Sequence, residues 1–229
     1  MEPNPWTPKT LARHIDHTVL APGATDEDLA NGCDLARQFG TAAIFVKPHY
    51  VITACRKMAG TGVKVGTVAG FPHGLSITRI KADEAQAAID MGAAEIDMVV
   101  NIGKVLSNDW SYVADDIAAV AEVVKTRGMM IKVIFENSYL ADVQKVKLCQ
   151  ICEQVGVDFA KTSTGFGAGG AIPADVALMV RNLRSVKVKA AGGIRRLADA
   201  IQMLEIGAAR IGTSATAEIM MEAQGVLKL

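Results

Sequence analysis

The sequence predicts an α/β protein that folds as a single (β/α)8 TIM barrel over residues 1–229, with a short N-terminal extension. Three observations support this prediction. The length fits one such domain, because α/β barrels of roughly 200–250 residues are single domains, and half of the 229 residues are hydrophobic. Amphipathic stretches that end at a glycine alternate with short apolar stretches. Eight stretches of each kind follow one another with no linker or low-complexity segment between them.

The expected strands are short and apolar, which is typical of strands that are covered on both faces. They are expected at residues 14–18, 42–46, 63–69, 95–100, 130–136, 157–162, 186–190 and 209–212. Several follow a glycine of the kind that closes a helix in the left-handed conformation. These glycines are Gly40, Gly92, Gly128, Gly156 and Gly207. Strands that alternate with helices in this way predict βαβ units and a parallel sheet.

The expected helices lie at residues 26–39, 50–59, 78–91, 110–127, 141–155, 174–183, 197–206 and 215–223. Thr25 stands before three acidic residues, as an N-cap does, and Pro173 stands where the first turn of a helix tolerates proline. An open, doubly wound sheet is the alternative arrangement. The first strand is not followed by the Gly-x-Gly-x-x-Gly loop of the dinucleotide-binding version, which favours the closed barrel.

Composition excludes several classes of partner. Lys+Arg and Asp+Glu both number 24, so the net charge is zero and neither nucleic acid nor an anionic membrane is expected to bind. Residues 1–6 lack the basic and apolar regions of a signal peptide, and no apolar run approaches the ~20 residues of a membrane span. The four cysteines, Cys149 and Cys152 among them, fall in helical patterns. We therefore expect a cytoplasmic protein with reduced cysteines.

Polar residues stand in expected strands that should be apolar. In a barrel, active-site groups come from the carboxyl ends of the strands. Asp16 lies in the first strand, Asp97 in the fourth, Lys161 ends the sixth, and Lys189 lies in the seventh. Each has a structural explanation as well. Lys161 taken alone fits a strand-end lysine that extends to solvent, and Asp97 fits the partner of a structural lysine.

Other polar residues are expected to be structural. Lys132 lies near the amino end of the fifth strand, where an ion pair inside the barrel is the simpler explanation. His17 is expected to be a hydrogen-bonded core histidine. The four histidines show no spacing with Cys, Asp or Glu that is typical of a metal site, so no metal is expected.

Lys161 and Lys189 are expected at the ends of adjacent strands, which lie about 4.8 Å apart. Two neighbouring ammonium groups repel, so one of them loses its proton more easily and becomes a nucleophile near neutral pH. Asp97 on a nearby strand would hold the other lysine as a cation or move protons. This set of groups is typical of an aldolase that forms a Schiff base with its substrate.

Glycines follow three of the expected strands and predict a phosphate site. Gly192 and Gly193 follow the seventh strand, Gly212 and Ser214 end the eighth, and Gly165 follows the sixth. Barrels frequently bind phosphate between the loops after strands seven and eight, through backbone N–H groups and a helix N-terminus. Glycine lets the backbone approach the anion closely.

Six motifs together resemble the deoxyribose-phosphate aldolase family, in order and over nearly the whole chain: IDHT (15–18), GFPHG (70–74), EIDMVVN (95–101), KTSTGFG (161–167), VKAAGGIR (188–195) and RIGTS (210–214). The resemblance implies a (β/α)8 barrel and a class I aldolase without metal or organic cofactor. Its reaction would be the reversible cleavage of 2-deoxy-D-ribose 5-phosphate into acetaldehyde and D-glyceraldehyde 3-phosphate, in deoxynucleoside catabolism. Members of the family are commonly dimers or tetramers.

By motif position the resemblance implies a role for each candidate residue. Lys161 is the Schiff-base lysine, Lys189 is the neighbouring cation that tunes it, and Asp97 works with Lys189 in proton transfer. Asp16 supports the proton network, and Arg195 helps at the rim. The resemblance assigns binding of the phosphate group to Gly165, Gly192, Gly193, Gly212 and Ser214.

The sequence also departs from the family pattern. Phe45 stands where many members have cysteine, and Ala215 stands where a second serine is common. The chain stops at Leu229 without the tyrosine-ending tail of some members. Two other functions stay open. A phosphosugar isomerase on the same barrel would need a carboxylate or histidine base and no essential lysine. A non-catalytic phosphosugar-binding barrel would not need two lysines and an aspartate that converge.

Overall fold

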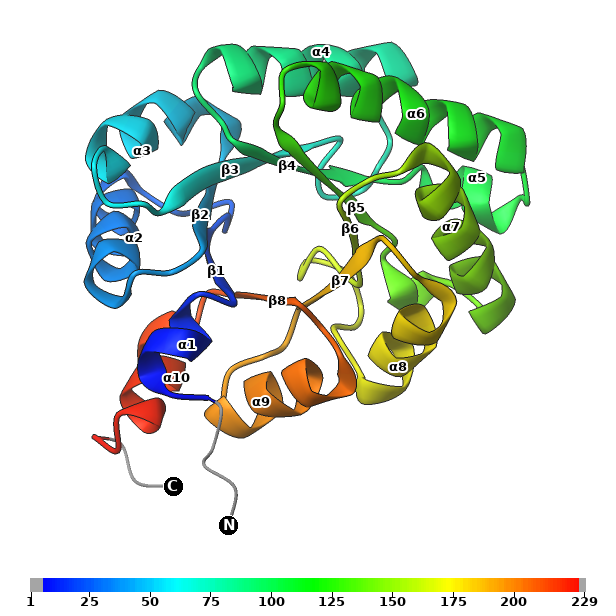
Figure 1. The fold of residues 1–229 in the computed structure, drawn as a ribbon. Helices are drawn as coiled ribbons and strands as arrows, with labels where there is room; N and C mark the ends of the chain where they lie inside the picture. The colour runs from blue at the N-terminus through cyan, green and yellow to red at the C-terminus, as the bar shows by residue number, and fades with distance from the viewer. Residues whose placement is uncertain (1–5, 227–229) are drawn as a thin grey trace.

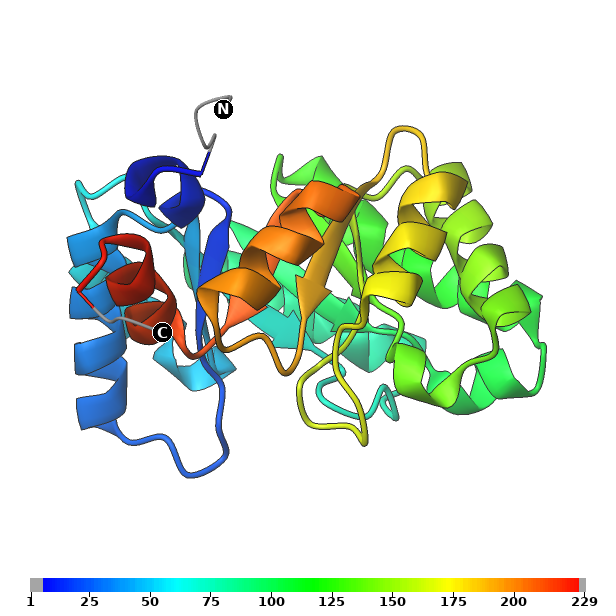
Figure 2. The same ribbon diagram turned by 90° about the horizontal axis from the view of Figure 1, so that it is seen from below.

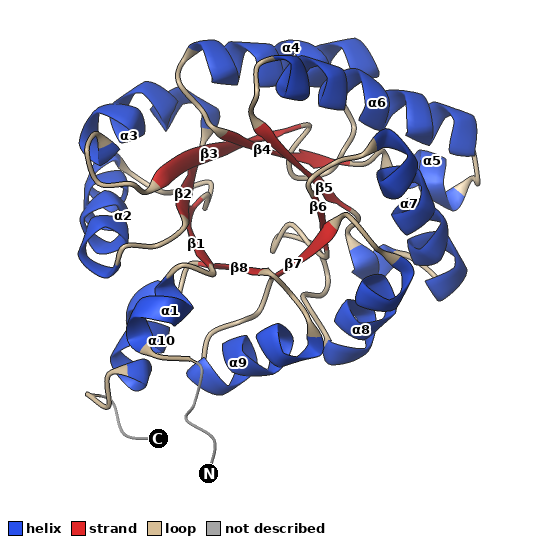
Figure 3. Ribbon diagram, viewed as in Figure 1, coloured by secondary structure: helices blue, strands red, loops and turns tan. Residues whose placement is uncertain are grey.

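A computed structural model describes residues 6–226 and forms a closed barrel of eight parallel strands in sequence order, surrounded by helices (Figures 1 and 3). The predicted (β/α)8 fold is confirmed. The strands are β1 (Ile15–Val19), β2 (Ala43–Val46), β3 (Lys64–Ala69), β4 (Glu95–Val99), β5 (Met130–Ile134), β6 (Phe159–Lys161), β7 (Lys187–Ala191) and β8 (Arg210–Thr213). Each strand begins and ends within two residues of its predicted bounds. The agreement is close because a parallel strand covered on both faces is apolar along its length, so its ends can be recognised in the sequence.

The helices that follow the strands also lie where the sequence places them. They are α2 (Asp26–Phe39), α3 (Val51–Met58), α4 (Thr78–Asp90), α6 (Trp110–Thr126), α7 (Asp142–Val155), α8 (Pro173–Asn182), α9 (Leu197–Ile206) and α10 (Thr216–Ala223). Thr25 forms a capping box with Asp28 at the start of α2. Gly40, Gly156 and Gly207 close their helices in the left-handed conformation, as predicted.

Four short elements were not predicted: α1 (Pro8–Ala12), η1 (Pro48–Tyr50), α5 (Ile102–Leu106) and η2 (Asn137–Tyr139). Each is five residues or fewer, too short to show an amphipathic period. α1 belongs to the predicted N-terminal extension and begins after the N-cap Thr7. Residues 1–5 of that extension, and the end of the chain at residues 227–229, lie outside the described residues.

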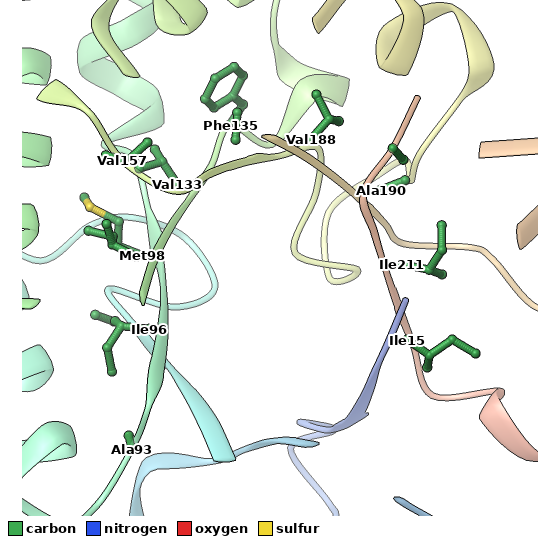
Figure 4. Close-up of a cluster of buried hydrophobic side chains, with 14 of the residues drawn as sticks. Ile15, Ala93, Ile96, Met98, Val133, Phe135, Val157, Val188, Ala190 and Ile211 are labelled. Carbon is green, nitrogen blue, oxygen red and sulfur yellow. The ribbon is translucent and has the colours of Figure 1, made fainter. Parts of the chain in front are cut away.

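The main hydrophobic core lies between the sheet and the helices. Apolar side chains such as Ile15, Met98, Val188 and Ile211 point away from the barrel axis toward the surrounding helices (Figure 4). Because successive side chains of a strand alternate between faces, the residues between them point into the barrel. On β1, β4, β5, β6 and β7 several of those inward positions are charged, so the centre of this barrel is polar.

The loops that build the catalytic face of a barrel leave the carboxyl ends of the strands. In Figure 2 the loops after β1, β3 and β6 extend from the lower end of the barrel, and α1 lies at the upper end. The long loop between β6 and α8 holds Gly165 with a φ of 88°, and the β7–α9 loop holds Gly192 and Gly193 with φ of 91° and 79°. Such angles favour glycine, and they let two glycine loops approach each other at one place.

No helix in the described part of the chain is long and apolar enough to cross a membrane. All four cysteines are free.

Candidate active site

Lys161 ends β6 and points into a cavity of about 680 Å³ at the carboxyl end of the barrel. Its side chain is 2% exposed, so the amine is almost completely buried apart from its contact with the cavity. The register places Lys161 beside Lys189 on β7, as the sequence predicts. Lys189 is fully buried below the cavity. The structure therefore presents one lysine to a ligand and keeps the other behind it.

Asp97 links the two lysines. Its Oδ2 accepts a hydrogen bond from Lys161 Nζ at 2.8 Å and another from Lys189 Nζ at 2.8 Å. Asp97 lies on β4, and both lysines reach it across the barrel interior. Lys189 also forms an ion pair with Asp16 Oδ2 at 2.6 Å. The four residues expected to carry the chemistry thus form one continuous chain of contacts.

Three more charged residues complete the cluster. Lys132 Nζ lies 3.2 Å from Asp97 Oδ1 and is hydrogen-bonded to Glu95. Arg210 forms an ion pair with Asp16 Oδ1 at 2.5 Å. The ion pair at Lys132 is the kind expected of its strand position, but it is joined to the catalytic candidates and not separate from them.

The cluster holds four basic side chains and three carboxylates. It therefore carries one net positive charge when Lys161 is an ammonium ion, and it is neutral when Lys161 is a free amine. A buried net charge is costly in a medium of low dielectric constant. The composition of the cluster consequently favours loss of one proton, and the cavity-facing lysine is the one that a ligand meets.

The pKa of Lys161 is lowered to about 8. Burial is the largest cause, because desolvation disfavours the ammonium form, and repulsion from Lys189 and Lys132 adds to it. Asp97 opposes the shift through its charge and its hydrogen bond. Burial therefore comes before the neighbouring Lys189 among the causes that lower this pKa.

The two aspartates are held as anions. Burial acts to raise the pKa of Asp97, but Lys132, Lys161 and Lys189 outweigh it and lower that pKa far below the ordinary value. Burial likewise acts to raise the pKa of Asp16, and Lys189, Lys132 and Arg210 lower it. Both carboxylates therefore accept hydrogen bonds near neutral pH.

The glycine loops lie together at the cavity. Its lining includes all five residues expected to hold phosphate: Gly165, Gly192, Gly193, Gly212 and Ser214. Arg195 also lines the cavity and adds a cation. A Cβ on Gly192 would lie 3.0 Å from the Cα of Gly170, so the close approach of the two loops depends on glycine.

Glu136 is a residue to which sequence reasoning assigned no role. It follows β5 in the left-handed conformation, with a φ of 58°, and its carboxylate accepts hydrogen bonds from the backbone N–H and the hydroxyl of Thr164. Thr164 directly precedes Gly165 and lines the cavity. A strained backbone at a non-glycine residue is a feature of functional sites, and here it aims a carboxylate that holds the β6–α8 loop.

His17 is a core residue, as expected. It is 5% exposed, and its Nδ1 lies 2.9 Å from the hydroxyl of Thr216. Burial lowers its pKa to about 4, so the imidazole is neutral near pH 7. Within residues 6–226, no three His, Cys, Asp or Glu side chains are grouped so that they could hold a metal ion.

Comparison with known proteins shows the family of this chain. The model of the DeoC/LacD family of aldolases matches residues 10–227. The chain belongs to the DeoC/LacD aldolase family. It is 47% identical to the deoxyribose-phosphate aldolase of Rhodopirellula baltica over 215 residues, which cover 93% of this chain and 89% of that protein. It is 46% identical to the deoxyribose-phosphate aldolase of Thermococcus kodakarensis, covering 93% of this chain and 96% of that one.

A solved structure of this family has the same fold. The deoxyribose-phosphate aldolase of Aeropyrum pernix, described as a tetramer, superposes with a TM-score of 0.90 at 31% identity. The match covers 96% of this chain and 94% of that one. In this DeoC/LacD aldolase, Ala215 is the N-cap of α10 and makes no side-chain cap hydrogen bond. Phe45, the other departure from the family pattern, is fully buried inside the barrel.

Proposed function

We propose that this chain is a class I aldolase that reversibly cleaves 2-deoxy-D-ribose 5-phosphate into acetaldehyde and D-glyceraldehyde 3-phosphate. The observation that carries the proposal is the amine of Lys161, which faces a cavity, is otherwise buried, and has a pKa lowered to about 8. Family membership and the names of the relatives support the substrate.

In the cleavage direction the neutral amine of Lys161 adds to the C1 aldehyde of the substrate. Loss of water from the carbinolamine gives an iminium ion. Removal of the proton from the C3 hydroxyl then breaks the C2–C3 bond, and the electron pair moves into the iminium to give an enamine. D-Glyceraldehyde 3-phosphate leaves, the enamine takes a proton at C2, and hydrolysis releases acetaldehyde and the free lysine.

The cluster behind Lys161 serves these proton transfers. Asp97 Oδ2 contacts both Lys161 and Lys189, so a proton can pass between the two amines through one carboxylate oxygen. Asp16 holds Lys189 from the other side. The iminium restores the positive charge that Lys161 gave up, and Asp97 lies next to the position where that charge forms.

Phosphate binds through the glycine loops. Gly165, Gly192, Gly193, Gly212 and Ser214 line one cavity, and α10 begins two residues after Ser214. Helix N-termini and exposed amides favour an anion. Anchoring at this end would place the aldehyde carbon of an open-chain sugar toward Lys161.

Trapping the iminium tests the proposal. The protein is incubated with acetaldehyde and a borohydride reagent, and the adduct is mapped by mass spectrometry. A single reduced adduct on Lys161 is expected. A phosphosugar isomerase or a non-catalytic phosphosugar-binding barrel would give no adduct, or adducts scattered over surface lysines. Activity that persists in a metal chelator is also expected, because the iminium itself accepts the electrons.

The setting of the reaction follows from its substrate. We infer that the enzyme acts in the cytoplasm, in the breakdown of deoxynucleosides, where 2-deoxyribose 5-phosphate is formed. We also infer that it forms a homodimer or homotetramer; the relative from Aeropyrum pernix is described as a tetramer. Light scattering after gel filtration measures the mass in solution, and a monomer would contradict the second inference.

A further inference from the structure

The ring of Phe45 lies inside the charged cluster. Its centroid is 3.9 Å from Lys189 Nζ and 4.3 Å from Lys132 Nζ, and the side chain is fully buried. Phe45 comes from β2, so the ring reaches across the barrel interior to lysines on β7 and β5. An aromatic face attracts a cation through its quadrupole, most strongly when both are desolvated.

The neighbouring strand makes room for this ring. Gly66 on β3 is the register partner of Phe45. A Cβ at Gly66 would lie 2.4 Å from the ring, so any other residue there would displace it. Leu20, Ala43 and Val68 pack with Phe45 in a small apolar cluster. The ring therefore packs against β3 on one side and lies beside the amines of Lys189 and Lys132 on the other.

An aromatic ring stabilises a cation differently from a carboxylate. A fourth carboxylate in the cluster would add negative charge and favour the ammonium form of every lysine, Lys161 included. The ring adds no net charge. It acts over a short distance, and it contacts Lys189 and Lys132 but not the cavity-facing lysine. The ring consequently acts on the amines of Lys189 and Lys132 and not directly on that of Lys161.

We propose that Phe45 is a positioning residue for the lysine pair: its ring holds the Nζ of Lys189 beside Asp97, the place from which the charge of Lys189 acts on Lys161. This inference rests on the proposed function, because it takes Lys161 as the nucleophile. Phe45 acts through Lys189 and does not touch the substrate cavity.

The groups that face Lys189 come from several elements. Asp97 on β4 accepts a hydrogen bond from its amine, and Asp16 on β1 forms an ion pair with it. Lys161 on β6 shares Asp97 with it, and Lys132 on β5 shares the ring of Phe45. Arg210 on β8 is its register partner and shares Asp16. The two carboxylates are shared with other cations. Phe45 carries no ionisable group, so its removal changes the environment of Lys189 without changing the formal charge of the cluster.

The test replaces Phe45 with leucine and measures the rate of borohydride trapping at Lys161 by acetaldehyde as a function of pH. Without the ring, the amine of Lys189 is free to move away from Asp97 and Lys161, so its repulsion of Lys161 weakens. The midpoint of the trapping profile is expected to move to higher pH by about half a unit.

Phe159→Leu is the matched control. Phe159 is a buried ring on β6, 3% exposed, and its centroid lies 5.8 Å from Lys132 Nζ and 5.6 Å from Arg210 Cζ. Both variants lose the same ring from the barrel interior, and thermal unfolding reports that loss in each. Phe159→Leu should leave the midpoint in place. An unmoved midpoint in Phe45→Leu, or equal movement in both variants, would overturn the inference.

A form of the protein with a fluorinated phenylalanine at position 45 covers the case in which Phe45→Leu fails to fold. Fluorine withdraws electron density from the ring face while the ring keeps its shape. The midpoint should again rise, and no change would contradict the inference. The wild-type profile separates this result from the proposed function. Absence of any Lys161 adduct in the wild type refutes the aldolase, whereas a wild-type adduct with unmoved variant profiles refutes only the role of Phe45.

Discussion

Lys189→Met removes the buried cation beside the proposed nucleophile and tests how the pKa of Lys161 is set. Both amines bond to Asp97 Oδ2 at 2.8 Å, so their nitrogens lie at most 5.6 Å apart. At that separation and an effective dielectric constant of about 20, two unit charges repel by roughly 3 kcal/mol, or about 2 pKa units. Burial, the larger cause, remains in the variant. We therefore expect the pKa of Lys161 to rise by about 1–2 units from its value of about 8.

The sign of the effect on rate follows from the amine that reacts. At pH 7 a pKa of about 8 leaves about one Lys161 amine in ten neutral, and each unit of increase lowers that fraction about tenfold. The rate of adduct formation at pH 7 should fall about 10–100-fold and recover as pH rises. The variant cluster holds three basic groups and three carboxylates, so it is neutral with Lys161 charged, and the fold should be retained.

The assay is the pH profile of trapping at Lys161, with Lys145→Met as the control. Lys145 is another buried lysine, and it forms an ion pair with Asp175 at 2.7 Å, away from the barrel interior. Its loss should lower the melting temperature and leave the profile of Lys161 unchanged. A Lys189→Met profile that superposes on that of the wild type would refute the electrostatic reasoning.

Three further predictions concern single residues. Lys161→Ala should abolish turnover and adduct formation while the melting temperature stays near that of the wild type; measurable turnover would exclude it as the nucleophile. Glu136→Ala removes the acceptor of the Thr164 N–H and hydroxyl, so the β6–α8 loop should lose its position. KM for the phosphorylated substrate should rise about tenfold in steady-state kinetics, and an unchanged KM would contradict this role. Ala215→Ser adds a hydroxyl beside Ser214, so KM for that substrate should fall about fivefold while KM for acetaldehyde stays constant; equal effects on both would argue against a phosphate contact.

Local sequence patterns were enough for the order and bounds of the strands. Each expected strand is a short apolar stretch after a helix end, and such features act over a few residues. α1 and α5 escaped prediction because five residues show no helical period. The positions of Lys161 and Lys189 were also readable, since an ionisable residue at the end of an apolar strand stands out by itself.

The charged interior was less accessible to sequence reasoning. Glu95 and Arg210 join the cluster only because the inward side chains of eight strands converge on one axis. Lys132 was expected in an ion pair inside the barrel, and the register that sets it beside Asp97 brings that ion pair into the network of the catalytic candidates. Glu136 was assigned no role, because its left-handed backbone is a property of the folded loop.

The sequence by itself therefore determined the βα repeat, the strand-end lysines and the glycine loops, because each depends on neighbouring residues along the chain. The tertiary structure alone decided which charges share the barrel interior. It decided that burial is the main cause of the lowered pKa of Lys161, and that the ring of Phe45 faces Lys189. Electrostatic and cation–π energies depend on distances and solvent exclusion between residues far apart in sequence, and only the closed barrel fixes those.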